Sequence, residues 1–386
     1  MTTKILIGDC IARMSDIEPG TVQTCVTSPP YWGLRDYGEG GQHGLEETPD
    51  AYVANMVQVF RAVRRCLRND GTLWLNLGDS YASNPASGGS GKQWENNNQR
   101  TPMDRKYRRP AGLKPKDLVG IPWRVAFALQ ADGWYLRSDI IWHKPNPMPE
   151  SVTDRPTKGH EYVFLLSKSG RYFYDADAIR EPATLGAHVR SRASNFKKAG
   201  SQDDKYGSHN NGAPEIVCDG TRNKRTVWTI TTRPYSGAHF ATMPPQLAEL
   251  CIKAGTSEYG RCGICGAPYM RIKERISTGK RYSTGKSKQK NDSGLVTGFS
   301  GYDDGSSSPV FKTTGWEKRC ECISDRVPCL VLDPYTGAGT TGLVAQHLRR
   351  SFVGCELNPE YAALAEKRIR MDSPLFSSVS MDEVTP

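Results

Sequence analysis

The sequence lacks the features of membrane-embedded and secreted proteins. No run approaches eighteen apolar residues, the length that a membrane-spanning helix needs, and residues 1–8 do not have the layout of a signal peptide. The 11 cysteines are dispersed and odd in number, unlike the paired framework of a small secreted domain. We therefore expect a soluble, intracellular protein with mostly reduced thiols and no membrane partner.

An excess of acidic residues is also absent. The 386 residues include 51 Lys and Arg against 41 Asp and Glu, which gives a net charge of +10 and a pI near 9.0. A basic chain suits a polyanionic partner, although ordinary solubility would explain the same excess. The length is sufficient for one large α/β domain with insertions.

The tetrapeptide Ser28-Pro29-Pro30-Tyr31 follows an apolar run at residues 22–26. Two prolines in succession remove two N–H donors, so the carbonyls of Ser28 and Pro29 can point outward as acceptors. Tyr31 adds an aromatic surface. A turn that is poor in donors and followed by an aromatic ring suits the amino group of an unstacked nucleobase. A stiff structural turn with a core tyrosine is the alternative interpretation.

A second turn follows the predicted strand at residues 331–333. Pro334, Tyr335 and a stretch with Gly337 and Gly339 lead into a predicted helix at residues 342–350. A strand, a glycine-rich turn and a helix N-terminus form a cradle that a ligand can approach closely. The turn is no P-loop, because the Lys-Ser/Thr ending is absent.

Glu356 ends the next predicted strand, at residues 351–355. An acidic residue at the tip of the second strand of a βαβ unit commonly accepts the two ribose hydroxyls of an adenosyl cofactor. We expect its side chain at an exposed strand end, and an amphipathic helix from there to about residue 369.

Strands and helices alternate along the chain. Apolar or alternating segments predict further strands, and longer amphipathic segments predict helices. The strands are expected at residues 4–7, 22–26, 72–77, 134–142 and 160–166, and the helices at residues 51–67 and 118–131. This order indicates an α/β fold with a doubly wound, mostly parallel sheet. Ligands of such sheets bind at the carboxyl ends of the strands, where both turns would meet.

Taken together, the two turns resemble those of the amino-group DNA methyltransferases that use S-adenosylmethionine. The order of motifs is similar to that of their beta group, in which the catalytic tetrapeptide precedes the glycine turn. The resemblance covers roughly residues 4–180 and 226–372. It implies a Rossmann-like methyltransferase fold, an enzyme acting on double-stranded DNA, and a cytoplasmic location in a prokaryotic cell or a phage-infected host. Whether a cognate restriction endonuclease exists as a partner stays open, as does the oligomeric state.

The resemblance also implies roles for individual residues. The tetrapeptide Ser28, Pro29, Pro30 and Tyr31 would be catalytic. The residues implied in cofactor binding are Asp9, His239, Phe240, Asp333, Pro334, Tyr335, Gly337, Gly339, Thr340, Thr341 and Glu356. Tyr335 stands where the family has Phe. Asp9 matches the family acid that contacts the adenine, and residues 239–244 resemble the segment that closes over the methionine end.

The resemblance implies a mechanism and a target base. The flipped base would donate hydrogen bonds from its amino group to Ser28 Oγ and the Pro29 carbonyl while Tyr31 stacks on its ring; Trp32 would extend that surface or belong to the core. A serine at position 28 goes mostly with cytosine N4 in this family, whereas Asp or Asn goes mostly with adenine N6. We therefore expect cytosine-N4 methylation, with adenine N6 as the alternative.

Three polar segments interrupt the α/β pattern. Residues 80–116 and 182–224 are basic and read as phosphate-contacting loops or as inert solvated loops. The expected domains are a catalytic half (1–180, with the mobile basic loop 80–116), a target-recognition region (181–225), a cofactor-binding half (226–260 and 323–372), a zinc-knuckle-like basic insertion (261–322) and a flexible tail (373–386).

The third segment, residues 261–322, has a pair of cysteines near each end. Cys262 and Cys265 form a tight knuckle with Gly266, and Cys320 and Cys322 follow a basic stretch. Four thiolates could hold a structural zinc ion; incidental reduced thiols are the alternative. A zinc-bearing DNA-binding protein with an inactive methylase core is a further hypothesis. Cys25, Cys66, Cys251 and Cys355 lie in apolar runs and are expected in the core.

Overall fold

The computed structural model of the chain describes residues 1–34, 36–82, 113–182, 221–232, 242–276, 310–372 and 378–382. The chain divides into two compact units. The larger unit contains residues 1–179, 225–269 and 318–386, and the smaller contains residues 180–224 and 270–317. The predicted insertion is thus divided: residues 270–317 belong to the smaller unit, and both cysteine pairs belong to the larger one.

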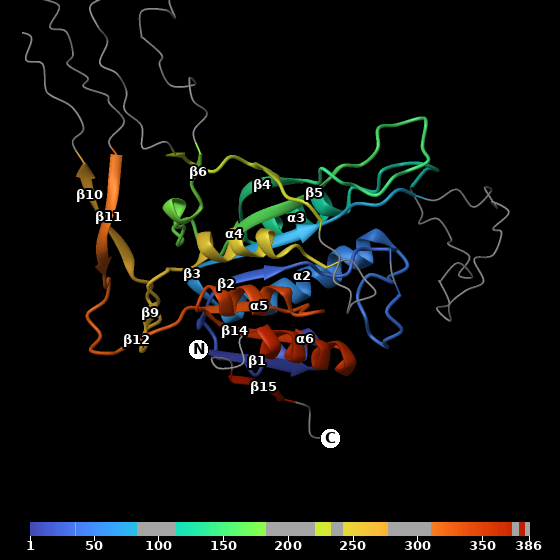
Figure 1. Cartoon of the computed structure of the whole chain (residues 1–386). Coiled ribbons are helices and arrows are strands. Elements are labelled where there is room, and N and C mark those ends of the chain that lie inside the picture. Colours follow the sequence, from blue (N-terminus) through green and yellow to red (C-terminus); the bar gives the residue numbers. More distant parts are fainter. Residues whose placement is uncertain are drawn as a thin grey trace, which may run out of the picture. The chain divides into compact units, whose positions relative to one another are not determined.

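A nine-stranded sheet forms the centre of the described part of the larger unit, in the order β15-β1-β14-β13-β2-β3-β5-β4-β8 (Figure 1). Its strands are β1 (Thr2–Ile7), β2 (Val22–Thr27), β3 (Leu67–Leu77), β4 (Tyr135–His143), β5 (His160–Ser167), β8 (Val227–Thr229), β13 (Leu330–Asp333), β14 (Ser351–Glu356) and β15 (Ser378–Asp382). Only β5 runs antiparallel to its neighbours, β3 and β4; the other neighbouring strands are parallel. The mostly parallel sheet that the sequence predicts is confirmed.

Helices cover both faces of this sheet. They are α1 (Cys10–Met14), α2 (Pro49–Cys66), α3 (Ile121–Ala131), α4 (Pro245–Gly255), α5 (Thr340–His347) and α6 (Pro359–Asp372), with a short 3-10 helix η2 (Ala176–Ile179). One core joins α1, α2 and α3 to the sheet through side chains such as Phe60 and Leu73. On the other face, α4, α5 and α6 pack through side chains such as Ile252 and Phe352. The sheet is therefore doubly wound.

The helix starts follow from local chemistry. The first residue of helix α2 is Pro49, a position where the missing N–H costs little. The preceding Thr48 caps the helix, since its hydroxyl accepts a hydrogen bond from the Ala51 amide at 3.1 Å. Helix α3 begins at Ile121 and not at residue 118 as predicted. The preceding Gly120 has a left-handed φ of 77°, a conformation that cannot continue a helix backward.

Strand β3 begins five residues earlier than predicted. It follows α2 directly at Leu67, which pairs with Val22, and the register shifts before Thr72 pairs with Thr24. The polar residues between Leu67 and Thr72 therefore lie in an irregular part of the strand. The predicted core positions of Cys25, Cys66, Cys251 and Cys355 are confirmed, because all four are buried.

Strands β2 and β13 mark the point where the winding changes direction. They pair in parallel, with Val331 opposite Thr24 and Leu332 opposite Cys25. The helix that follows β13 lies on one face, and the helix that follows β2 lies on the other. The chain therefore diverges at the carboxyl ends of these two strands, which is where open α/β sheets bind ligands.

The smaller unit contains two small sheets in its described residues. Strands β6 (Glu181–Pro182) and β7 (Thr221–Arg222) pair through Glu181 and Arg222, whose side chains form an ion pair of 2.8 Å. Strands β10 (Met270–Ile276) and β11 (Val310–Glu317) form an antiparallel pair in which Arg271 lies over the Trp316 ring. Residues 83–112, 183–220, 277–309, 373–377 and 383–386 lie outside the described residues, and with them most of both predicted loops and of the tail. None of the described helices combines the length and the apolar character needed to cross a bilayer.

Candidate active site

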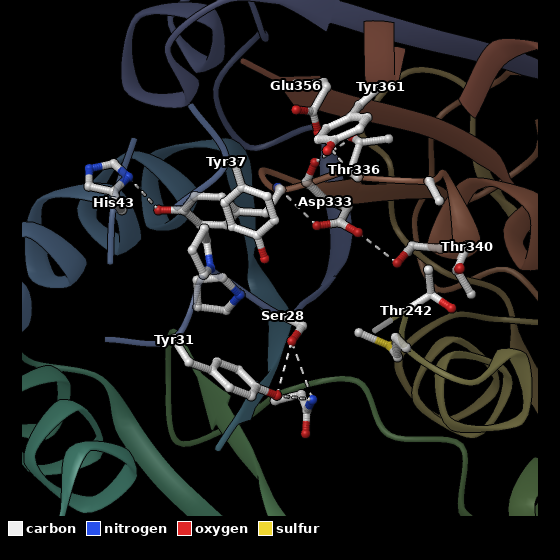
Figure 2. Close-up of a pocket in the computed structure, with 18 of the residues that line it drawn as sticks. Ser28, Tyr31, Tyr37, His43, Thr242, Asp333, Thr336, Thr340, Glu356 and Tyr361 are labelled. Atoms are coloured by element: carbon white, nitrogen blue, oxygen red, sulfur yellow. Dashed lines mark hydrogen bonds between the residues drawn. The ribbon is translucent and has the colours of Figure 1, made fainter. Parts of the chain in front are cut away.

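A cavity of about 840 Å³ opens at the carboxyl ends of the central strands. The segments that follow β1, β2, β13 and β14 line it, together with residues that follow β4. Figure 2 shows Ser28 and Tyr31 on one side of this cavity and Asp333, Thr336 and Glu356 on the other. The two predicted turns, about three hundred residues apart in the sequence, therefore open into one space.

Asp333 ties the two turns together. Its side chain is buried, and its carboxylate accepts hydrogen bonds from the hydroxyls of Thr27 and Thr341, both at 2.7 Å, and from the Tyr335 amide at 3.0 Å. Burial raises the pKa of Asp333, and the two hydroxyls act against this rise. Because Thr27 ends β2 and Thr341 lies in α5, this carboxylate fixes the tetrapeptide turn against the glycine-rich turn.

The glycines of the second turn have different positions. Gly337 lines the cavity and has a left-handed φ of 51°. Gly339 caps α5 and does not line the cavity; a Cβ there would lie 2.8 Å from the Cβ of Ala365 in α6. Gly337 is thus placed where a ligand can approach, whereas Gly339 permits two helices to pack closely.

Glu356 ends β14 beside Gly337. Its Oε2 accepts a hydrogen bond from the Gly337 amide at 2.7 Å, and its Oε1 accepts one from the Asn358 amide at 3.1 Å. The expectation of an exposed strand end is wrong, because the residue is half-buried and its carboxylate braces the glycine-rich turn. Burial raises the pKa of Glu356, while the amides that donate to it act in the opposite direction.

The remaining described residues predicted to bind a cofactor lie at the same cavity. Asp9, Pro334, Tyr335, Thr340 and Thr341 all line it. Asp9 also caps α1, since its Oδ1 accepts from the Ala12 amide at 2.9 Å.

The side chains of Tyr335 and Thr340 have partners within the protein. The Tyr335 hydroxyl lies 3.0 Å from His43 Nδ1, and Arg368 donates to Thr340 Oγ1 at 3.0 Å. Burial lowers the pKa of His43, which favours the neutral imidazole. His239 and Phe240 lie outside the described residues, although the neighbouring Thr242 and Met243 line the cavity.

The two proline carbonyls of the tetrapeptide turn differ in their partners. The Tyr52 hydroxyl donates to the Pro30 carbonyl at 2.9 Å. No donor among the described residues contacts the Pro29 carbonyl. Gly44 packs behind the turn, where an added Cβ would lie 3.1 Å from the Tyr31 carbonyl oxygen. The turn is therefore held by contacts to Pro30 and Tyr31, and Ser28 and Pro29 line the cavity.

Tyr31 lies with its ring against the backbone of Gly78. A Cβ at position 78 would come within 2.5 Å of the ring atom Cε2. The Tyr31 hydroxyl donates to Glu161 Oε2 at 2.7 Å and lies 3.3 Å from Ser28 Oγ. Burial, followed by the negative charge of Glu161, raises the pKa of Tyr31 well above its usual value. The tyrosine is therefore a neutral, fixed ring.

Sequence reasoning missed three polar residues beside this turn. Asn76 Nδ2, in β3, lies 3.3 Å from Ser28 Oγ, 2.8 Å from Tyr31 Oη and 3.1 Å from Glu161 Oε2, and these three acceptors share its two hydrogens. Its buried Oδ1 has no partner among the described residues. Lys144, in the segment after β4, forms an ion pair with Glu161 Oε1.

A sequence signal existed for two of these residues. Asn76 and Glu161 are polar positions inside apolar strands, and buried polar side chains need partners. Trp32, by contrast, belongs to the core: it is buried, and its Nε1 donates to the Glu46 carbonyl at 2.9 Å. It does not extend the stacking surface.

Comparisons with known proteins agree with this geometry. A family model described as DNA methylase matches residues 22–262 and 327–367, more than half of the chain. The chain is 40% identical over 369 residues to the type II methyltransferase M.SmaI of Serratia marcescens, covering 95% of this chain and 90% of that protein. It is 39% identical over 364 residues to the type II methyltransferase M.XycI of Xanthomonas campestris pv. cyanopsidis, covering 94% and 86%.

A solved structure supports the fold. The PvuII DNA methyltransferase (cytosine-N4-specific) superposes with a TM-score of 0.50 at 16% identity, covering 99% of this chain and 96% of that chain. The chain belongs to the DNA methylase family, so the resemblance to the amino-group methyltransferases that use S-adenosylmethionine is confirmed.

Proposed function

We propose that this DNA methylase transfers a methyl group from S-adenosylmethionine to the exocyclic N4 of a cytosine flipped out of double-stranded DNA. One observation carries the proposal: the Ser28-Pro29-Pro30-Tyr31 turn and the glycine-rich turn end neighbouring parallel strands and open into one cavity. A base amine and a methyl donor could therefore be held together.

The side of the cavity formed by β13, α5 and β14 fits an adenosyl cofactor. The carboxylate of Glu356 lies at a strand end where ribose hydroxyls can donate to it, and Gly337 leaves backbone open to close approach. The cavity volume of about 840 Å³ falls in the range of small-molecule sites. When bound, S-adenosylmethionine supplies an electrophilic methyl group on a sulfonium that departs as a neutral thioether.

The side formed by β2 and β3 fits the amino group of a base. That group has two N–H donors, and the turn offers two acceptors, Ser28 Oγ and the Pro29 carbonyl. The Pro30 carbonyl is already occupied by Tyr52. Accepting both hydrogens draws the nitrogen lone pair out of conjugation with the ring, which makes the amine a better nucleophile and orients it. The ring of Tyr31 is held in place by its close contact with Gly78 and lines the cavity, where a base could stack on it.

A path for the released proton begins at the same turn. When the nitrogen forms its bond to the methyl carbon, it carries one proton too many. Ser28 Oγ can take that proton and pass its own to Tyr31 Oη, which in turn donates to Glu161. Glu161 would end the transfer as a carboxylic acid. Its ion pair with Lys144 would form again when solvent removes the proton.

The choice of cytosine rests on Ser28. A hydroxyl can both accept from an amine and donate onward, whereas an ionised Asp only accepts. The family correlation of serine with cytosine N4 points the same way. Adenine N6 remains the alternative product, because both bases present an exocyclic amine that the same two acceptors could hold.

The partner would be double-stranded DNA. The net charge of +10 favours a polyanion, and the exposed Leu34 and Met148 line the cavity where they could contact a displaced base or its neighbours. The relatives are type II methyltransferases, so we expect a restriction endonuclease with the same recognition sequence in the source organism.

Nucleoside analysis tests the proposal. DNA from cells that express the protein, in a host without its own amino-methylation, would be digested and analysed by mass spectrometry. We expect N4-methylcytosine, and its level should fall towards the vector background for the Tyr31→Ala variant. N6-methyladenine would replace the cytosine assignment, and the absence of both nucleosides from cells that hold the folded protein would refute the methylation proposal.

A further inference from the structure

Four cysteine sulfurs of the larger unit gather away from the catalytic cavity. The Sγ atoms of Cys262, Cys265, Cys320 and Cys322 all lie within 4.8 Å of one another, and none of these residues lines the cavity. Zinc–sulfur bonds of about 2.3 Å in a tetrahedron place neighbouring sulfurs roughly 3.8 Å apart. The cluster therefore has the dimensions of a four-thiolate metal site.

Exposure distinguishes three of these four cysteines from the other described cysteines. Cys265 is exposed and Cys320 and Cys322 are half-buried, whereas every other described cysteine outside the cluster is buried. A cysteine that serves only as a small apolar side chain belongs in a core. Three accessible thiols that converge on a buried one, Cys262, are therefore unexplained by packing.

Backbone pairing brings the two cysteine pairs together. Strand β9 (Arg261–Cys262) pairs with β12 (Arg326–Val327), which brings the chain after Cys322 beside the first knuckle. The knuckle closes through hydrogen bonds from the Cys262 amide to Ala267 and from the Gly266 amide to Cys262, at 2.9 and 3.0 Å. Gly266 takes a left-handed φ of 70°, which this turn requires.

Hydrogen-bond donors contact one of the cysteine sulfurs and the backbone carbonyls of two of the cysteines. The Ser324 hydroxyl lies 3.0 Å from Cys262 Sγ, and the backbone amides of Ile264 and Cys265 also direct hydrogen bonds to that sulfur. Two cations, Lys318 and Arg68, bind the carbonyls of Cys322 and Cys265 respectively. Four thiolates around a divalent ion leave two negative charges, which such donors stabilise.

The positions of the two cysteine pairs in the sequence indicate the role of the site. Cys265 precedes β10, and Cys320 follows β11, so about 55 residues separate the two pairs. An ion bound by both pairs closes this long segment at its base. It would also hold β9 against β12, an antiparallel pair of only two residues on each strand.

We propose that these four cysteines bind one structural Zn²⁺, which joins the chain entering β10 to the chain leaving β11. The inference does not depend on the identity of the methylated base. The ion stabilises the β9–β12 region and takes no part in methyl transfer.

Metal analysis tests the proposal. The full chain, purified under reducing conditions without a chelator, should contain about one zinc per chain. The Cys265→Ser/Cys322→Ser variant should lose it. Cys329→Ser is a matched control: this buried thiol is near in sequence, but it donates to the Ser257 carbonyl and lies outside the cluster. Equal zinc in the parent and the double variant, or its absence from the parent, would overturn the site.

Two further measurements cover a double variant that fails to fold. Titration of the metal-free, reduced parent with Co²⁺ should give a thiolate-to-cobalt charge-transfer band and the intense visible bands of tetrahedral coordination. In hydrogen exchange, removal of the metal should speed exchange in β9 and β12 and leave β13 unchanged. A Co²⁺ titration of the reduced protein without these bands would contradict the proposal.

Discussion

The contact between Gly78 and Tyr31 offers the sharpest test of the catalytic geometry. A Gly78→Ala substitution would place its Cβ 2.5 Å from Tyr31 Cε2 and 2.8 Å from Cδ2. Carbon atoms in contact lie about 3.5–4.0 Å apart, so the ring must move by roughly 1 Å. Position 78 has an ordinary backbone conformation, so the added methyl group brings steric conflict without backbone strain.

A displacement of about 1 Å in a catalytic site costs on the order of 100-fold in rate. We expect the single-turnover rate of Gly78→Ala to fall by about that factor, or roughly 2.7 kcal/mol. Cofactor affinity, measured by calorimetry, should stay near the parent value, because the residues that line the cofactor side of the cavity are untouched. Gly159→Ala is the control, since a Cβ there meets nothing within 4 Å.

A double-variant cycle separates this effect from general destabilisation. In a Tyr31→Ala background the ring is gone, so Gly78→Ala should cost almost nothing further in rate. Thermal melting of the same proteins shows whether the fold is intact. A parent rate for Gly78→Ala, or a full additional loss in the Tyr31→Ala background, would refute the placement of the Tyr31 ring as the stacking surface.

Two further predictions concern hydrogen bonds of the site. Tyr31→Phe keeps the ring but breaks the path from Ser28 to Glu161. Its single-turnover rate should therefore lie between those of the parent and Tyr31→Ala, because the Ala variant also loses a stacking contact of about 1–3 kcal/mol. Equal rates for the Phe and Ala variants would contradict separate roles for the ring and the hydroxyl. Glu356 accepts hydrogen bonds best when ionised, so cofactor affinity should hold at neutral pH and weaken as the pH falls through its raised pKa. Glu356→Gln should bind the cofactor about 2–3 kcal/mol more weakly, without that pH dependence, in calorimetry across the acidic range; a pH profile like that of the parent would exclude Glu356 as the titrating group.

The sequence predicted the sheet and the two turns because their signals are local. A proline pair fixes its own backbone, and a glycine-rich turn between a strand and a helix is recognisable from neighbouring residues. Boundaries were less accurate where tertiary pairing decides them. Leu67 joins β3 because Val22 lies opposite it, and nothing near Leu67 in the sequence announces that partner.

The polar residues behind the catalytic turn show where local reasoning ends. Ser28 and Tyr31 are recognisable from a tetrapeptide, but their partners Asn76 and Glu161 come from β3 and β5, which the sequence presents as ordinary buried strands. Only the sheet order places β3 beside β2 and β5 on the far side of β3. Asp333 is a related case: the motif suggested a ligand contact, whereas the structure shows a carboxylate with three donors from its own chain.

These internal partners have a consequence for how the site could work. Asp333 joins β2 to α5, and Glu356 joins β14 to the turn before α5, so the walls on both sides of the cavity are fixed by the protein's own hydrogen bonds. Such a site is preorganised: its acceptors are already in place, so that little of the binding energy is lost to ordering the site. The energy of DNA binding would then be available for extracting the base. On this reasoning, substitutions at Asp333 should lower stability and rate together, whereas substitutions at Ser28 should lower rate alone.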